Sequence, residues 1–172
     1  MAARRSPTPR AQLDAFLDRF LPDVARRARA ALRTLRTICP GALELVYDNT
    51  NALAIGFSPT ERASDVIVSI AVYPRYPSLF FLQDGVKLPD PTGRLRGAGN
   101  RVRHIVLDDR SVLDAPDVRK LLSIALSRAR VPLDPKARRA IVIKSIAAKQ
   151  RPRRPAEPVA KVSPARRRAP RG

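Results

Sequence analysis

Glycines and basic side chains gather between Gly85 and Arg103, and this stretch is the part of the sequence best suited to binding chemistry. Its members are Gly85, Lys87, Gly93, Arg94, Arg96, Gly97, Gly99, Arg101 and Arg103. Glycine lets backbone amides converge on an anion, and the planar guanidinium of arginine matches phosphate oxygens. These residues could form an anion-binding loop. A long loop with positive-φ glycines and solvated arginines is the alternative. Because Gly97 and Gly99 precede a predicted strand, the loop is neither a Rossmann nor a Walker motif.

Polar residues also lie near the ends of the first two predicted strands. They are Tyr47, Asp48, Asn49, Glu61, Arg62 and Asp65. Polar side chains at strand ends often line small-molecule pockets, whereas ordinary turn chemistry explains the same residues without a ligand. The ligand site that we predict from both stretches comprises Tyr47, Asp48, Asn49, Arg62, Arg94, Arg96, Gly97, Gly99 and Arg103.

His104 is the chain's only histidine, and strand alternation places it with Val102 and Val106, opposite Ile105. It could act as a general base, but the sequence places no serine, cysteine or carboxylate beside it. An ordinary strand histidine is the favoured interpretation. We therefore predict no catalytic residue and no cofactor, and a binding protein in preference to an enzyme.

Cys39 is the only cysteine, which excludes an intrachain disulfide and a metal site made of cysteines alone. We predict no metal site and a reducing compartment. The first ten residues are charged and lead into a broken amphipathic pattern, not into a signal peptide. No stretch approaches the roughly 18 to 20 apolar residues of a spanning helix. These features predict a cytoplasmic protein without a membrane partner.

The net charge of +19 is concentrated toward the ends of the chain. The last 23 residues hold five prolines and one acid, and their basic side chains are Arg151, Arg153, Arg154, Lys161, Arg166, Arg167, Arg168 and Arg171. This composition cannot bury enough apolar surface to offset ordering entropy. We predict disordered ends at residues 1–10 and 150–172 around one domain at 11–149. The tail could hold nucleic acid through phosphates, without sequence readout, or serve only solubility under a biased genomic composition.

Two periodicities predict the elements of the domain. Apolar residues recur every three or four positions from Leu13 to Ile38, which indicates helix. Pro22 is tolerated only near a helix start, so we expect a short helix to Phe20 and a longer one from Pro22. A further helix is expected to start at residues 114–116 and to end before Pro132.

Alternating and β-branched residues predict five to six strands. We place them at residues 43–47, 53–57, 66–73, 78–82, 102–107 and 141–146. The run at 66–73 is nearly all apolar, which indicates a central strand buried on both faces. Short connections favour antiparallel pairing. The predicted fold class is α+β, with two N-terminal helices and one C-terminal helix packed on an antiparallel sheet.

Between residues 12 and 154 the chain carries a set of short motifs that is specific when the motifs are taken together. They are Leu45-Val46-Tyr47-Asp48-Asn49, Gly56-Phe57, Pro59-Thr60-Glu61-Arg62-Ala63-Ser64-Asp65, Tyr73-Pro74-Arg75, Leu79-Phe80-Phe81-Leu82, Leu88-Pro89-Asp90-Pro91, Leu95-Arg96-Gly97-Ala98-Gly99-Asn100, Val102-Arg103-His104-Ile105 and Ile143-Lys144-Ser145-Ile146-Ala147-Ala148-Lys149-Gln150-Arg151-Pro152-Arg153. In these motifs the chain resembles the YdhG-like family of small bacterial domains of unknown function. The resemblance implies an α+β fold with helices on an antiparallel sheet, and it supports the strand at 141–146.

Some proteins of that family are labelled iron chaperones by analogy with frataxin, which binds metal on an acidic helix surface. The candidates here, Asp14, Asp18 and Asp23, are followed closely by arginines that would repel a cation. We expect instead a non-enzymatic binding module that takes a small anion or a protein through loops at 47–65 and 85–103. The alternative is a nucleic-acid-associated protein that binds phosphates through its tail.

Overall fold

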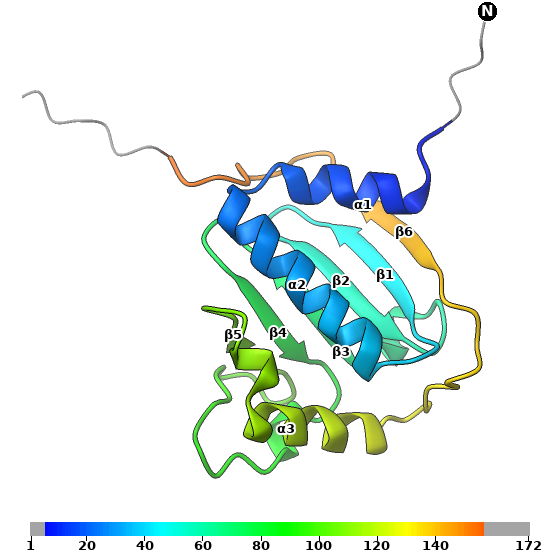
Figure 1. Cartoon of the computed structure of the whole chain (residues 1–172), viewed down its shortest axis with the longest axis vertical. Coiled ribbons are helices and arrows are strands. Elements are labelled where there is room, and N and C mark those ends of the chain that lie inside the picture. The colour runs from blue at the N-terminus through cyan, green and yellow to red at the C-terminus, as the bar shows by residue number, and fades with distance from the viewer. Residues whose placement is uncertain (1–5, 157–172) are drawn as a thin grey trace, which may run out of the picture.

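The computed structural model describes residues 6–156, and these residues form an α+β fold, as predicted. Two helices cross one face of a six-stranded sheet and a third helix lies at one end (Figure 1). The helices are α1 (Pro9–Asp18), α2 (Pro22–Ile38) and α3 (Pro116–Ser127). The strands are β1 (Leu43–Asp48), β2 (Leu53–Ser58), β3 (Val68–Val72), β4 (Pro77–Phe81), β5 (Arg103–Val106) and β6 (Ile141–Ile146). The 3₁₀ turns are η1 (Ala63–Asp65), η2 (Gly85–Lys87) and η3 (Val112–Asp114).

Local signals set the starts of the two N-terminal helices. Thr8 Oγ1 accepts a hydrogen bond from the Ala11 amide at 3.2 Å, and Pro9 occupies the first turn of α1, where its missing amide hydrogen is not needed. Pro22 has the same place in α2, so the predicted division into two helices is confirmed. Because Thr8 caps α1, the structure begins within the segment 1–10 that was predicted to be disordered.

The sheet has the strand order β5-β4-β3-β2-β1-β6. Strands β1 to β5 each pair antiparallel with their neighbours in sequence. Strand β6 pairs parallel with β1, so the prediction of a purely antiparallel sheet is wrong. The cause is the connection before β6: a chain that returns through α3 and a long loop can enter the sheet from the same end as β1.

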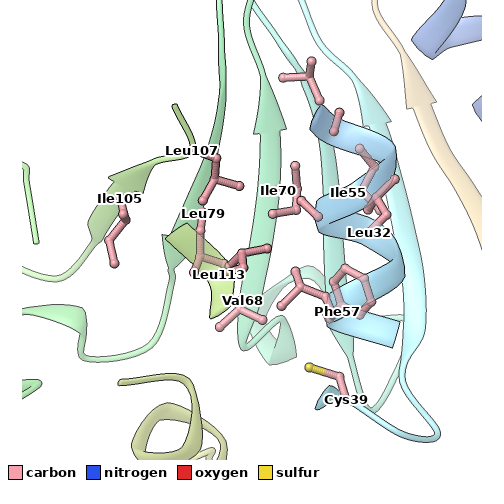
Figure 2. Close-up of a cluster of buried hydrophobic side chains, with 14 of the residues drawn as sticks. Leu32, Cys39, Ile55, Phe57, Val68, Ile70, Leu79, Ile105, Leu107 and Leu113 are labelled. Carbon is pink, nitrogen blue, oxygen red and sulfur yellow. The ribbon is translucent and has the colours of Figure 1, made fainter. Parts of the chain in front are cut away.

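One face of the sheet carries the hydrophobic core. Helix α2 lies over the sheet, and Figure 2 shows its Leu32 above Ile55 of β2 and Ile70 of β3. Val118 and Leu122 extend this core from α3. Each of these side chains is almost fully buried, and such burial contributes about 1.5–3 kcal/mol per residue. This face therefore supplies most of the stability of the domain.

The opposite face has small residues at its centre. On β2 and β3 the positions that alternate with core residues are Ala54, Gly56, Ser69 and Ala71. Strand pairing places Ala54 beside Ala71 and Gly56 beside Ser69. Because larger side chains flank these four positions, the surface of this face is recessed along β2 and β3.

Gly41 joins α2 to β1 and lets two backbone segments meet. Its φ is +77°, and a Cβ there would overlap the carbonyl oxygen of Asp134 in the loop before β6. Gly93 has a similar φ of +69°, but no atom lies within 4 Å of its hypothetical Cβ. The two glycines therefore share backbone conformation and differ in crowding.

Gly41→Ala is expected to lower the free energy of unfolding by about 3 kcal/mol or more, because steric overlap adds to left-handed strain. Gly93→Ala is the matched control and should cost only about 1–2 kcal/mol, the strain alone. Urea denaturation of both variants measures the difference. Equal losses would contradict the close approach at Asp134.

Candidate ligand site on the open face of the sheet

A hollow of about 310 Å³ lies on the face of the sheet that carries the small residues. It is lined by Tyr47, Asn49, Ala52, Ala54, Gly56, Ala63, Val66, Ser69, Ala71, Tyr73, Phe80 and Leu82. Small-molecule sites in proteins have volumes of roughly 300–1,000 Å³ and mostly apolar walls. The hollow fits the lower end of that range, and none of its lining residues is Asp, Glu, Lys, Arg or His.

Strand register produces the shape of this hollow. Tyr47 on β1 lies opposite Ala54 on β2, and Ala54 lies opposite Ala71 on β3. The two alanines make a low floor beside the tyrosine ring. Phe80 on β4 lies opposite Ser69 and forms the facing wall. Tyr47 and Phe80 thus lie in neighbouring cross-strand rows, diagonally across the small residues of β2 and β3. This diagonal arrangement leaves space for a flat group between the two rings.

The hydroxyl of Tyr47, a residue that lines the hollow, has no hydrogen-bond partner among the described residues. It is buried and makes no hydrogen bond to any residue that the structure describes. Ser69 differs, since its Oγ donates to the Ile55 carbonyl at 3.1 Å. A buried hydroxyl without a partner costs about 1–3 kcal/mol. A ligand group that reaches the Tyr47 hydroxyl would therefore remove this cost.

His104 and Arg96 lie beyond the Phe80 wall. The His104 ring stacks on Phe80 with centroids 5.0 Å apart. Arg96 and His104 exchange two backbone hydrogen bonds, of 2.8 and 3.0 Å, so their side chains share the open face. Burial lowers the pKa of His104, and the Arg96 cation lowers this pKa further. His104 is thus a neutral packing residue beside the hollow, in keeping with the ordinary strand histidine favoured above.

The arginines of the Gly85 to Arg103 stretch do not converge on one point. Arg94 is held by Asp117 through bonds of 2.7 and 3.3 Å. Arg103 donates to the carbonyls of Gly99 and Val102 in its own loop. Two predicted site residues are therefore engaged within the protein, and the solvated-loop alternative describes this stretch better than an anion cradle.

The loop glycines and Arg62 also lie apart from the hollow. Gly97 has a φ of +120°, a backbone conformation that favours glycine without any ligand, and Gly99 is exposed. Arg62 is exposed in the turn before η1, where its amide donates to Thr60 Oγ1 at 3.1 Å. Of the nine residues predicted as the ligand site, the structure brings only Tyr47 and Asn49 into the hollow.

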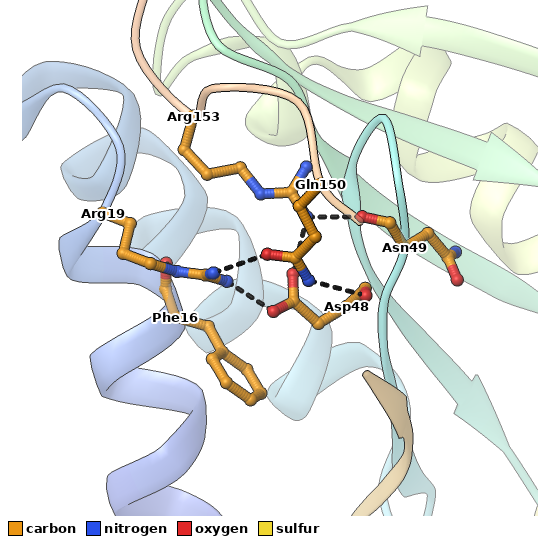
Figure 3. Close-up of polar contacts among 6 residues, drawn as sticks. All are labelled: Phe16, Arg19, Asp48, Asn49, Gln150 and Arg153. Carbon is orange, nitrogen blue, oxygen red and sulfur yellow. Dashed lines mark hydrogen bonds and ion pairs between the residues drawn. The ribbon is translucent and has the colours of Figure 1, made fainter. Parts of the chain in front are cut away.

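Asp48 points to the other side of the sheet and is fully buried there (Figure 3). Its carboxylate binds Arg19 at 2.5 Å and Arg153 at 2.7 Å. Gln150 donates to the Asp48 carbonyl at 3.0 Å and accepts from Arg19 at 2.7 Å. A ligand role for Asp48 is therefore wrong: strand alternation turns it away from Tyr47 and into an internal ion cluster.

Residues 147–154 form a strap, by which we mean the segment that follows β6 and crosses the β1–β2 hairpin. The Ala147 amide donates to the Asp48 carbonyl at 2.8 Å, and the Arg151 amide to the Thr50 carbonyl at 2.8 Å. Arg154 reaches the Arg19 carbonyl at 3.2 Å. The prediction of a disordered tail from residue 150 fails for residues 150–156, because Asp48 offers a buried partner that composition does not reveal.

The strap changes the set of cations that could meet nucleic acid. The side chain of Arg153 is only 4% exposed and bonds Asp48 and the Asn49 carbonyl. The Arg151 side chain is exposed. The other cations predicted for the tail, Lys161, Arg166, Arg167, Arg168 and Arg171, lie outside the described residues.

The acidic residues of the helices are paired with arginines. Arg29 approaches Asp14 at 3.9 Å and Asp18 at 2.7 Å. Asp23 pairs with two arginines of α2, and hydrogen bonding by the nearer one lowers the pKa of the Asp23 carboxyl. These contacts agree with the expectation that arginines oppose cation binding on this surface.

Comparisons with known proteins add no relative. Neither a protein-family model, nor a curated protein, nor a solved structure matches the chain. Membership of the YdhG-like family therefore stays a prediction. In the described part of the chain, every helix is too short or too polar to cross a lipid bilayer.

Sequence reasoning missed the floor and one wall of the hollow. Ala54, Gly56 and Ala71 carry no functional group, and Phe80 reads as an ordinary strand residue. One signal was present: Ala54 and Gly56 alternate with large core residues on β2. A strand with large side chains on one face and small ones on the other indicates a recessed surface. Only the pairing of the strands shows that the small residues of β3 lie beside those of β2.

Asp48→Asn is expected to lower the free energy of unfolding by about 3–5 kcal/mol, because it leaves the buried Arg153 cation without a countercharge. Asp23→Asn removes the two ion pairs of an exposed carboxylate and should lower the free energy of unfolding far less. Chemical denaturation measures both. Equal behaviour of the two variants would show that the buried cluster does not stabilise the fold.

The stability of the protein should fall on acidification through His104. Its pKa is lowered in the folded state, so the unfolded chain binds the proton more readily, and unfolding becomes easier below the ordinary value of 6.5. His104→Phe keeps a ring on Phe80 and removes this titration. Between about pH 7 and about pH 5 the free energy of unfolding should therefore fall more for the wild type than for the variant. Chemical denaturation at both pH values measures this difference. An NMR titration that places the pKa of His104 at or above 6.5 would contradict this prediction.

Proposed function

We propose that this protein is a non-catalytic binding module that takes a flat, mostly apolar small molecule in the hollow on the open face of its sheet. One observation carries the proposal: a hollow of about 310 Å³ is lined by the rings of Tyr47 and Phe80, and the buried hydroxyl of Tyr47 has no hydrogen-bond partner in the described part of the chain. A mostly apolar pocket with a few placed polar groups is the usual form of a small-molecule site.

The chemistry of the lining defines the ligand class. The floor of Ala54 and Ala71 favours a thin group, such as a fused or single aromatic ring, lying between Tyr47 and Phe80. Rings prefer offset-stacked or tilted contacts, which contribute about 0.5–1.5 kcal/mol each beyond burial. The ligand should carry one hydrogen-bonding group that meets the Tyr47 hydroxyl.

An anionic ligand receives less support than a neutral one. The lining residues include no cation. Arg96 is separated from Phe80 by His104, which pairs with Phe80 on one side and with Arg96 on the other. Bringing a carboxylate into an apolar hollow without a countercharge is costly. Within the broader expectation of a small-molecule or protein partner, we therefore favour a neutral small molecule.

Nucleic-acid binding through the C-terminal segment remains the alternative proposal. Arg153 is withdrawn from solvent by its contact with Asp48, which reduces the number of cations that could reach phosphates. No other contact in the described residues favours this alternative over the hollow.

The proposal is tested with naphthalene, 2-naphthol and 2-naphthoate as probes. We expect 2-naphthol to bind best and to shift the NMR signals of the Ala54 and Ala71 amides. Tyr47→Phe should weaken its binding about fivefold, the effect of losing one hydrogen bond of roughly 1 kcal/mol, and should leave naphthalene binding unchanged.

A matched pair of variants locates the site. Ala54→Leu fills the floor and should abolish binding of all three probes. Ala15→Leu, at an exposed position of α1 on the opposite face of the sheet (Figure 1), should not alter binding. If none of the three probes moves signals of β2 and β3 at millimolar concentration, or if Ala54→Leu binds them as well as the wild type, the proposed function is wrong.

A further inference from the structure

Strand β6 forms an edge of the sheet, and its outer side is open. Among the described residues it pairs with β1 alone. The Glu44 amide donates to the Ala140 carbonyl, which fixes the pattern of bonds between the two strands. Bonding groups alternate between the two sides of a strand, so the amides and carbonyls of Ile141 and Ile143 point away from β1. Such unpaired groups are a template for an additional strand.

The charged side chains that β6 and its flanking segments contribute to this edge are all basic. No Asp or Glu occurs between Lys136 and Arg154. Arg138 and Arg139 precede β6, and Lys144 lies within it; all three are exposed. Lys144 approaches Glu61 at 3.5 Å, whereas the side chains of Arg138 and Arg139 make no hydrogen bond or ion pair to the described residues. An incoming chain therefore meets uncompensated positive charge at the start of β6.

A second hollow, of about 340 Å³, opens beside the start of β6. Arg10 of α1, Arg36 of α2 and Arg139 line it, together with Ile141. The one carboxylate of its lining, Glu44, is bound by Arg36 through bonds of 2.6 and 2.8 Å. Arg10 and Arg139 are thus left to receive an anionic group that arrives along the edge.

We propose that the β6 edge binds an acidic segment of another protein, which extends the sheet as an added strand. Main-chain hydrogen bonds to Ile141 and Ile143 hold the segment, as in other cases of strand addition. Its carboxylates enter the hollow and meet Arg10 and Arg139, because guanidinium groups bind carboxylates in a fixed, charge-assisted geometry.

Two other occupants fit the edge less well. A second copy of this chain would bring two basic edges together, and like charges oppose such pairing. Nucleic acid matches the charge but cannot use the alternating amides of a strand, and β6 holds no aromatic side chain on which bases could stack.

The experiment uses the full-length protein and a ten-residue peptide of alternating glutamate and valine. Two further peptides of the same sequence carry N-methyl groups on one or the other set of alternate amides. Fluorescence anisotropy measures affinity at low ionic strength, and NMR reports the β6 amides. We expect the parent peptide and one methylated peptide to bind equally. The other methylated peptide should bind more than about tenfold more weakly, since several main-chain bonds are lost together.

Protein variants separate charge from backbone pairing. Arg139→Glu should weaken binding of the parent peptide by about fivefold, the upper range for one exposed ion pair. Lys120→Glu makes the same charge change on the exposed side of α3 and should have no effect beyond a small loss common to any acidic substitution. Neither variant touches the hollow around Tyr47, so this test is independent of the proposed ligand.

Three results would overturn the proposal. Equal binding of both methylated peptides would show attraction by charge without strand pairing. Displacement of the parent peptide by a single-stranded oligonucleotide of equal charge, with the same loss on Arg139→Glu, would assign the edge to nucleic acid. A concentration-dependent dimer that broadens the β6 amides in the absence of peptide would assign the edge to a second copy of the chain.

Discussion

The buried carboxylate of Asp48 is the constraint on which the ends of the fold depend. An ion removed from water is costly unless partners surround it, and Asp48 obtains them from Arg19 after α1 and from Arg153 in the strap. One side chain on β1 therefore ties together an N-terminal helix, the sheet and the last part of the described chain. Both arginines pair with this one charge, so the positions of the three segments depend on each other.

Alternation along β1 links this cluster to the candidate site. Asp48 faces the helices, while its neighbours Tyr47 and Asn49 line the hollow on the other face. The strap bonds to the backbone of Asp48, Asn49 and Thr50. The end of the hollow is thus held from behind by groups that never touch a ligand, an arrangement that keeps a binding surface preformed.

The sequence predicts the elements well because hydrophobic period and proline position are local signals. The two N-terminal helices, separated at Pro22, and the six strands follow from such signals. The parallel entry of β6 could not be predicted from short connections, since it depends on where a long loop runs. The site is harder to predict. Ala54, Gly56 and Ala71 form it because their side chains are small or absent, and such residues give no functional signal. Arg153 has the composition of a disordered tail around it, and only its contact with the buried Asp48 shows that it belongs to the fold. Charge composition alone does not show which arginines form ion pairs within the protein, because these pairs depend on the tertiary structure.

The parallel pairing of β6 with β1 has a consequence for the order in which the protein is made. The strand next to β1 on that side, and the arginine that neutralises Asp48, are synthesised after β1 to β5, and Arg153 lies 105 positions after Asp48. A nascent chain that has completed β1 to β5 still has β1 as an unpaired edge, and its Asp48 carboxylate lacks Arg153. Contacts of such long sequence separation form slowly, so the domain closes only when translation has passed the strap, and until then β1 is the surface most exposed to wrong pairing.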